Sequence, residues 1–138
     1  MASGLCPLVF CGPVVDDKSA GMGAYTGRLS NSVAELLALR AGLQIVGPLL
    51  QVERVTVFYD SRYAGNLAQQ RTRPRAHLRL VRTVVDMAAD VRTTRELSWC
   101  WVRGHGANAG NRWADRLARM GLEGIHLDAV DAGGLPVT

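Results

Sequence analysis

The chain has 138 residues, of which 48% are hydrophobic and 20% are charged, a balance typical of one folded domain with a buried core. Its net charge is +4, and fifteen of its sixteen basic residues are arginines, whose planar guanidinium groups suit phosphate oxygens. Three cysteines without a Cys-x-x-Cys pair argue against a disulfide framework and a cysteine-based zinc site. No stretch approaches the ~18 apolar residues of a membrane span, so we expect a soluble, intracellular protein with no membrane partner.

The N-terminal third predicts a hairpin followed by a helix. Leu8–Val15 is rich in β-forming residues, although Gly12-Pro13 interrupts it, and Met22–Leu29 is expected to return as the second strand. The apolar residues of Val33–Ile45 recur at helical spacing, and Gly47-Pro48 ends that pattern.

The middle of the chain alternates strands with helices. Val52–Tyr59 is nearly continuous in β-formers, which predicts a central strand. A short helix over Arg62–Gln69 and an amphipathic helix over His77–Val91 follow, and then a strand over Leu97–Val102. Helices between two strands imply that the strands pair in parallel, so we expect an α/β fold.

Between residues 71 and 95, seven arginines accompany two aspartates. The helix in this stretch is expected to turn an apolar face inward: Leu78, Val81, Val84, Val85 and Ala88. Arg75, Arg79 and Arg82 fall on another face, which suits the phosphates of a nucleic acid. The alternative is a solvated face on which Arg82 pairs with Asp86 at helical i, i+4 spacing.

The last third carries a glycine-rich loop with a histidine, His105, between Gly104 and Gly106. Asn111 is expected to cap a helix over Asn111–Met120, and Asp115 follows on the same helix face. The acidic stretch after Gly121 shows no period and is expected to be irregular. We therefore predict a domain over residues 1–121 and a tail over residues 122–138.

Three carboxylates occupy positions that suit catalysis: Glu35 in the first turn of a helix, Asp60 at the end of the expected central strand, and Asp115 early in the last helix. If they converge, their repulsion favours a hard cation such as Mg²⁺ or Mn²⁺. Two such ions would stabilise a phosphodiester displacement, and His105 could pass a proton to the leaving group.

Each of these residues also has a structural interpretation. Glu35 can complete a capping box with Ser32, and Asp60 can cap the short helix that follows it. Asp115 can pair with neighbouring arginines in solvent, and His105 can be an ordinary loop residue.

Three segments together resemble successive motifs of the ribonuclease H family: Asn31–Leu39, Tyr59–Ala64 and Val102–Ala118. The most specific feature is the spacing from His105, six residues to Asn111 and four more to Asp115. The resemblance implies a five-stranded mixed sheet with helices on both faces. It also implies hydrolysis of the RNA strand of RNA/DNA hybrids with two Mg²⁺ ions.

By that resemblance, Glu35, Asp60 and Asp115 would bind metal, and His105 would assist product release or proton transfer. Six residues would meet nucleic acid, by resemblance or by charge: Asn31, Ser32, Arg62, Arg75, Arg79 and Asn111. The motifs are similar in style to ribonuclease H domains of retroelements, which suggests a reverse transcriptase-associated origin within a larger polyprotein or ribonucleoprotein assembly.

The first motif of the family, an aspartate at the end of the first strand, is absent. In the favoured register, Leu8–Val15 and Met22–Leu29 are the second and third strands, so the first strand is missing or altered. A second register makes Leu8–Cys11 the first strand, and a third uses Asp16 or Asp17 as the missing carboxylate. Two-metal catalysis could therefore be impaired, and the alternative function is a non-catalytic nucleic-acid-binding or scaffold domain.

Overall fold

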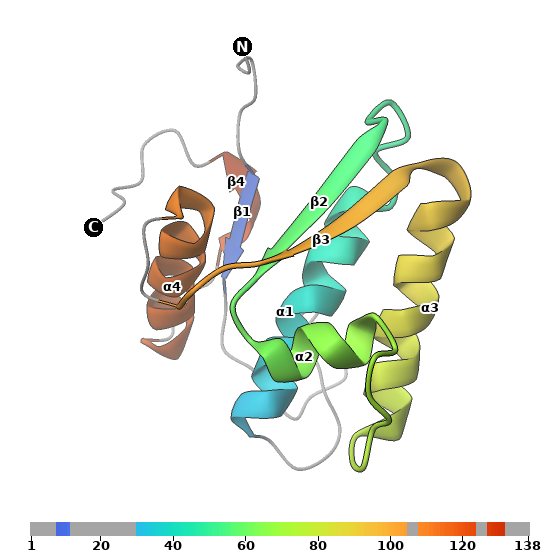
Figure 1. Ribbon diagram of the computed structural model, residues 1–138. Coiled ribbons are helices and arrows are strands. Elements are labelled where there is room, and N and C mark those ends of the chain that lie inside the picture. Colours follow the sequence, from blue (N-terminus) through green and yellow to red (C-terminus); the bar gives the residue numbers. More distant parts are fainter. Residues whose placement is uncertain (1–7, 12–29, 105–107, 124–126, 132–138) are drawn as a thin grey trace.

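The computed structural model describes residues 8–11, 30–104, 108–123 and 127–131. These residues form four helices and four strands, shown in Figure 1, in the order β1 (Leu8–Cys11), α1 (Asn31–Val46), β2 (Arg54–Tyr59), α2 (Arg62–Ala68), α3 (Leu78–Thr94), β3 (Glu96–Trp101), α4 (Ala109–Leu122) and β4 (Leu127–Asp131). None of the described helices is long and apolar enough to cross a membrane.

Strands β2 and β3 pair in parallel, as expected, with Arg54 opposite Glu96 and Tyr59 opposite Trp101. Burial alternates along β2, so one face of the pair packs on the helices while the other stays open, with Phe58 53% exposed. Within the described residues, β3 is the one strand partner of β2. The prediction that β2 is a central strand is therefore not confirmed within the described residues.

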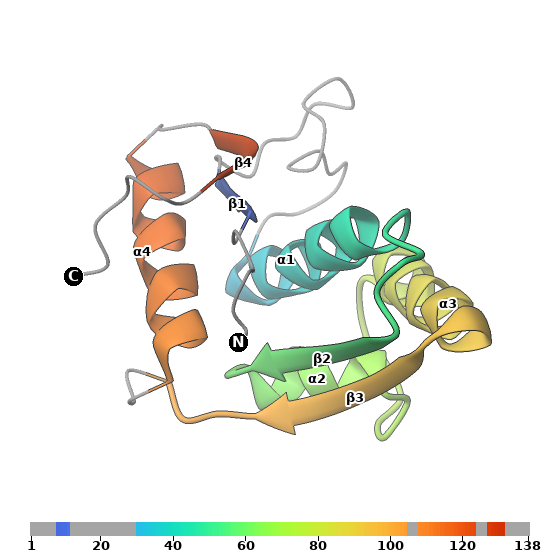
Figure 2. The ribbon, with the colours of Figure 1, turned by 90° about the horizontal axis from the view of Figure 1, so that it is seen from above.

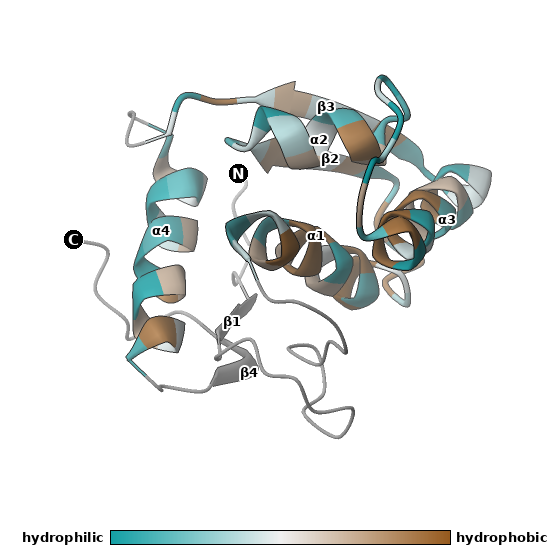
Figure 3. Ribbon diagram, turned by 90° about the horizontal axis from the view of Figure 1, so that it is seen from below, coloured by the Kyte–Doolittle hydropathy of each residue, from teal (hydrophilic) through white to brown (hydrophobic). Residues whose placement is uncertain are grey.

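The core lies between the β2–β3 pair and helices α1, α2 and α3 (Figure 2). The apolar face expected on α1 is confirmed, since Val33, Leu36 and Leu37 are buried. In Figure 3 the brown, apolar parts of α1 and α3 lie toward each other, whereas α4 is mostly hydrophilic.

Helix α3 buries Val81, Val84 and Ala88 as the periodicity predicts. The prediction was wrong for Leu78, which is 62% exposed. Leu78 is the first residue of α3, directly after His77 in left-handed conformation, and it lies at the rim of a surface pocket. Arg82 does pair with Asp86, at 3.9 Å, although both side chains are largely exposed.

The expectation of an irregular C-terminal tail was wrong for Leu127–Asp131, which forms β4. Its antiparallel partner is β1, so Leu8–Cys11 pairs at the C-terminal end of the chain and not with β2. The segment Met22–Leu29, expected as a further strand, lies outside the described residues, as do Asp16 and Asp17. The favoured register, in which Leu8–Val15 and Met22–Leu29 are the second and third strands, and the register that uses Asp16 or Asp17 therefore stay predictions.

A buried arginine joins α1 to the start of β3. Arg95 is 7% exposed, and its guanidinium donates to three carbonyl oxygens just after or at the end of α1: Val46 at 2.7 Å, Gly47 at 2.9 Å and Leu49 at 3.2 Å. The last carbonyls of a helix have no partner within the helix, and burial makes each unpaired one costly. Arg95 therefore stabilises the corner where α1 ends.

Replacing Arg95 with alanine should lower the free energy of unfolding by about 2–4 kcal/mol, because a charge-assisted donor is lost and several carbonyls lose their partner. Urea denaturation followed by circular dichroism would measure the change. Arg92→Ala, at an exposed position near the same end of α3, is the matched control and should change stability by less than about 0.5 kcal/mol. Equal effects of the two substitutions would contradict this role for Arg95.

Candidate active site

The carboxyl ends of β2 and β3 meet at one edge of the fold. The amide of Val102 donates to the carbonyl oxygen of Tyr59 at 2.8 Å, which extends the pairing one residue past β3. In Figure 2 both strand arrows point toward the side of the molecule where α4 and the start of α1 lie. Residues that directly follow these strands are thereby brought near the first turns of two helices.

Asp60, the residue after β2, is held at this edge by two hydrogen bonds. Its Oδ2 accepts from the side-chain amide of Asn111 at 3.2 Å, and its carbonyl oxygen accepts from the indole Nε1 of Trp101 at 3.1 Å. Gly104 also lies close, because a Cβ placed there would be 3.5 Å from Asp60 Oδ2. Asn111 is 7% exposed, so α4 is anchored to Asp60 through a buried amide.

The sequence-based assignments of the helix caps were wrong by one to three residues. Ser30, not Ser32, caps α1 by accepting from the amide of Val33, so Glu35 lies past the first turn and is not in a capping box. Ser61, not Asp60, caps α2, which leaves the Asp60 carboxylate available to other partners.

The cap of α4 is likewise Asn108 and not Asn111. The side chain of Asn108 accepts from the amide of Asn111 at 2.8 Å. The helix therefore begins at Ala109, and Asn111 lies inside its first turn, where its side chain can turn inward to Asp60.

The electrostatics of Glu35 show that the three predicted carboxylates share one region. Its pKa is raised above its ordinary value of 4.5, first by partial burial and then by the negative charges of Asp60 and Asp115. Glu35 itself remains open to solvent, so the effect is moderated by water. Asp60, directly after β2, and Asp115 of α4 therefore lie near enough to Glu35 of α1 to repel its negative charge.

The other predicted site residues are divided between this edge and a more distant surface. Asn31 and Ser32 form the first turn of α1, and both are accessible. Arg75 and Arg79 are exposed in the α2–α3 loop and at the start of α3. His105 lies outside the described residues.

The sequence analysis missed Trp101 as a site residue. Its side chain is 40% exposed, the Arg62 guanidinium carbon lies 4.0 Å from its ring centroid, and its Nε1 donates to Asp60. Alternation along the strand gives the face on which Trp101 lies, but the contact with Arg62 depends on how α2 docks. No local pattern in the sequence reports that contact.

The family model for RNase H matches residues 10–123, which is most of the chain. The chain belongs to the ribonuclease H family. The match covers every helix described above, and the α/β fold expected from the ribonuclease H resemblance is confirmed.

Two proteins named Ribonuclease H share shorter stretches with the chain. The one from Nitrosomonas eutropha is 47% identical over 36 residues, which are 26% of this chain and 22% of that protein. The one from Ralstonia nicotianae is 50% identical over 40 residues, 29% of this chain and 26% of that protein. The aligned stretches thus span about a quarter of these ribonuclease H relatives.

The carboxylates suit a divalent metal in their chemistry, because they offer oxygen donors whose mutual repulsion a cation would relieve. Within the described part of the chain, however, no group of three His, Cys, Asp or Glu side chains is gathered closely enough to hold a metal ion.

Glu35→Gln should stabilise the metal-free protein at neutral pH by about 0.5 kcal/mol, a gain kept small by solvent screening. Because the folded-state pKa of Glu35 is raised, the native protein binds its proton more tightly than the unfolded chain does. Stability is therefore lost as pH rises from the unfolded value of 4.5 through the folded pKa, and the advantage of the variant should vanish below pH 4.5.

Thermal melts of both proteins from pH 3.5 to 8 in EDTA would measure this difference. When Mg²⁺ replaces EDTA in these melts, the Tm of the native protein should rise more than the Tm of Glu35→Gln, since a ligand that binds the folded state stabilises it. If the difference in stability between the native protein and Glu35→Gln does not change with pH, repulsion between Glu35 and the other two carboxylates is contradicted.

Proposed function

We propose that this chain is an endonuclease that hydrolyses the RNA strand of RNA/DNA hybrids by a two-metal mechanism. The proposal is supported by the repulsion that Asp60, held at the carboxyl end of β2, and Asp115 exert on Glu35 in a chain of the ribonuclease H family. Neighbouring carboxylates repel one another, and a bound cation would relieve that repulsion.

In this proposal Glu35, Asp60 and Asp115 hold Mg²⁺ or Mn²⁺, with two ions bound during turnover. When bound, the ions polarise the scissile phosphate and stabilise the attacking and leaving oxygens. The chain's own residues supply the positioning. Asn111 and Trp101 fix the orientation of Asp60 through its carboxylate and its carbonyl, and His105 assists proton transfer or product release.

The hybrid is proposed to cross the start of α1 and the arginines of α2 and α3. Asn31 and Ser32 lie beside Glu35 on α1 and would contact the minor groove. Arg62, Arg75 and Arg79 are exposed and would contact phosphates, which makes binding weaken steeply with salt. Asn111 is buried against Asp60, so its influence on nucleic acid would pass through that carboxylate.

The absent first-motif aspartate is expected to weaken the metal site, since three carboxylates would neutralise less of the charge of two divalent ions than four would. Asp16 or Asp17 is a proposed substitute for the fourth carboxylate. A retroelement or ribonucleoprotein context also stays a proposal.

Purified protein should cleave a labelled RNA/DNA hybrid in Mg²⁺ or Mn²⁺, and Asp60→Asn should reduce cleavage at least about 100-fold, because a metal-binding charge is lost while the shape is kept. Gel analysis of the end-labelled RNA strand would measure the rate. Asp90→Asn, the same change at an exposed position on α3, should cleave at the native rate. Well-folded protein that binds the hybrid but does not cleave it in either metal would favour the scaffold alternative.

Arg62→Ala should weaken hybrid binding about 3- to 10-fold through loss of a phosphate contact, and the loss should be smaller in a Trp101→Leu background. The reason is that the indole face holds the guanidinium in place, an interaction of about 0.5–1 kcal/mol at an accessible site. Fluorescence anisotropy in the four members of the cycle measures the coupling. Strictly additive effects would show that Trp101 does not position Arg62.

A further inference from the structure

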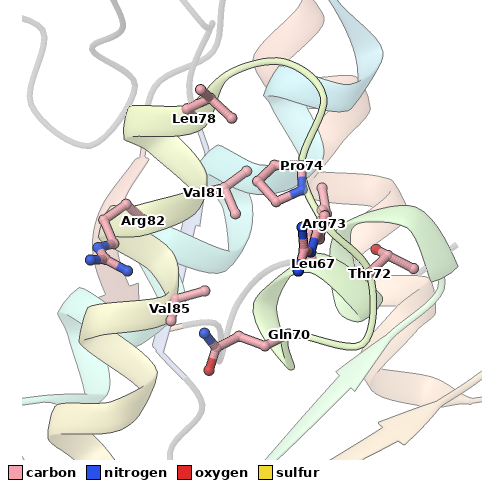
Figure 4. Close-up of a pocket in the computed structure, with 9 residues that line it drawn as sticks. All are labelled: Leu67, Gln70, Thr72, Arg73, Pro74, Leu78, Val81, Arg82 and Val85. Carbon is pink, nitrogen blue, oxygen red and sulfur yellow. The ribbon is translucent and has the colours of Figure 1, made fainter.

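A pocket of about 520 Å³ opens between the end of α2, the loop after it and the first turns of α3. Figure 4 shows Leu67, Val81 and Val85 within it, with Leu78 and Pro74 toward one end. Leu67 and Val81 are nearly fully buried and form an apolar floor, whereas Leu78 is 62% exposed at the rim. Leu78 and the floor beneath it leave apolar surface in the pocket that a ligand can cover.

The charge around this pocket has one sign. Arg73 and Arg82 both line it, and none of its nine described lining residues is acidic. The ion pair of Arg82 with Asp86 is long, at 3.9 Å, and both side chains are exposed, so it does little to neutralise the arginine. The pocket therefore suits a ligand that combines an apolar part with a nearby negative charge.

The pocket is also near the candidate active site. Helix α2 starts directly after Asp60 and Ser61 and has seven residues, so its length is about 10 Å. Gln70, two residues past the end of α2, lines the pocket. The pocket therefore lies at the opposite end of α2 from Asp60, within reach of a nucleic-acid strand that contacts the candidate active site.

We propose that this pocket holds one unpaired nucleotide of a single-stranded tail that flanks the hybrid. Its base packs on Leu78 and the apolar floor, and its phosphates meet Arg73 and Arg82. Bases inside a duplex are stacked and cannot enter such a pocket, whereas those of single strands can be splayed out. An acidic peptide with an apolar side chain has similar chemistry, but the distance to Asp60 favours the substrate strand. The inference rests on the proposed function.

The test compares a blunt hybrid with hybrids that carry one five-nucleotide tail, placed in turn at each end of each strand. A further set carries abasic tails of the same length at the same places. Anisotropy in EDTA gives the affinities without cleavage. One tail should raise affinity about fivefold over the blunt form, and its abasic version should lose most of that gain, because burying about 40 Å² of the apolar surface of a base is worth ~1 kcal/mol. Leu78→Ser should remove the gain while binding the blunt hybrid normally.

Leu50→Ser is the matched control, since Leu50 is 68% exposed in the turn after α1, away from the pocket, and this variant should keep the gain. Equal affinities for blunt and tailed hybrids would overturn the proposal, as would equal gains from normal and abasic tails. Binding of an acidic, leucine-containing peptide that is lost in Leu78→Ser, with no effect of tails, would assign the pocket to a peptide. If the protein binds free single strands but not the blunt hybrid, the proposal for the pocket stands and the proposed function is refuted.

Discussion

The parallel register of β2 and β3 is the constraint on which the candidate site depends. Tyr59 lies opposite Trp101, and the pairing continues to Val102, so Asp60 lies beside the indole that binds its carbonyl oxygen. A shift of one residue would turn every side chain of a strand to the opposite face. The buried faces of Val55 and Leu97 hold the register, because either would be exposed by such a shift. Core packing thus fixes where the carboxylate is placed.

The site at this edge is electrostatically unfavourable in the absence of a ligand. Glu35 is partly desolvated and is repelled by the charges of Asp60 and Asp115, whereas the buried polar groups of Arg95 and Asn111 have hydrogen-bond partners. Local electrostatic conflict of this kind is typical of a functional site. Asn111 supplies a neutral donor to Asp60 and adds no charge, so it orients the carboxylate without lowering the attraction of the site for cations.

The sequence predicted what depends on periodicity and spacing. Helix α1, the β2–β3 pair and the buried side of α3 follow from apolar patterns, and the ribonuclease H motifs indicated Glu35, Asp60 and Asp115 before the structure related them. It did not distinguish caps where several candidates are adjacent, as with Ser30 and Ser32. Arg95 was missed because its carbonyl partners lie 46 to 49 residues away along the chain. Strand β4 has five residues, and its partner β1 lies at the other end of the chain, so no local pattern revealed it.

Helix α2 lies between Asp60 and the pocket, and its position on β2 is fixed. The Tyr59 ring lies so close to Gly65 that a Cβ there would overlap it, and the Tyr59 hydroxyl accepts from Gln69 Nε2 at 3.1 Å. The same ring meets Trp99 edge to face, with 6.1 Å between centroids. One aromatic side chain therefore holds the middle and the end of α2 against the sheet. Because Asp60 follows Tyr59 directly and Leu67 and Gln70 line the pocket, this contact helps to set the separation between the carboxylate and the pocket.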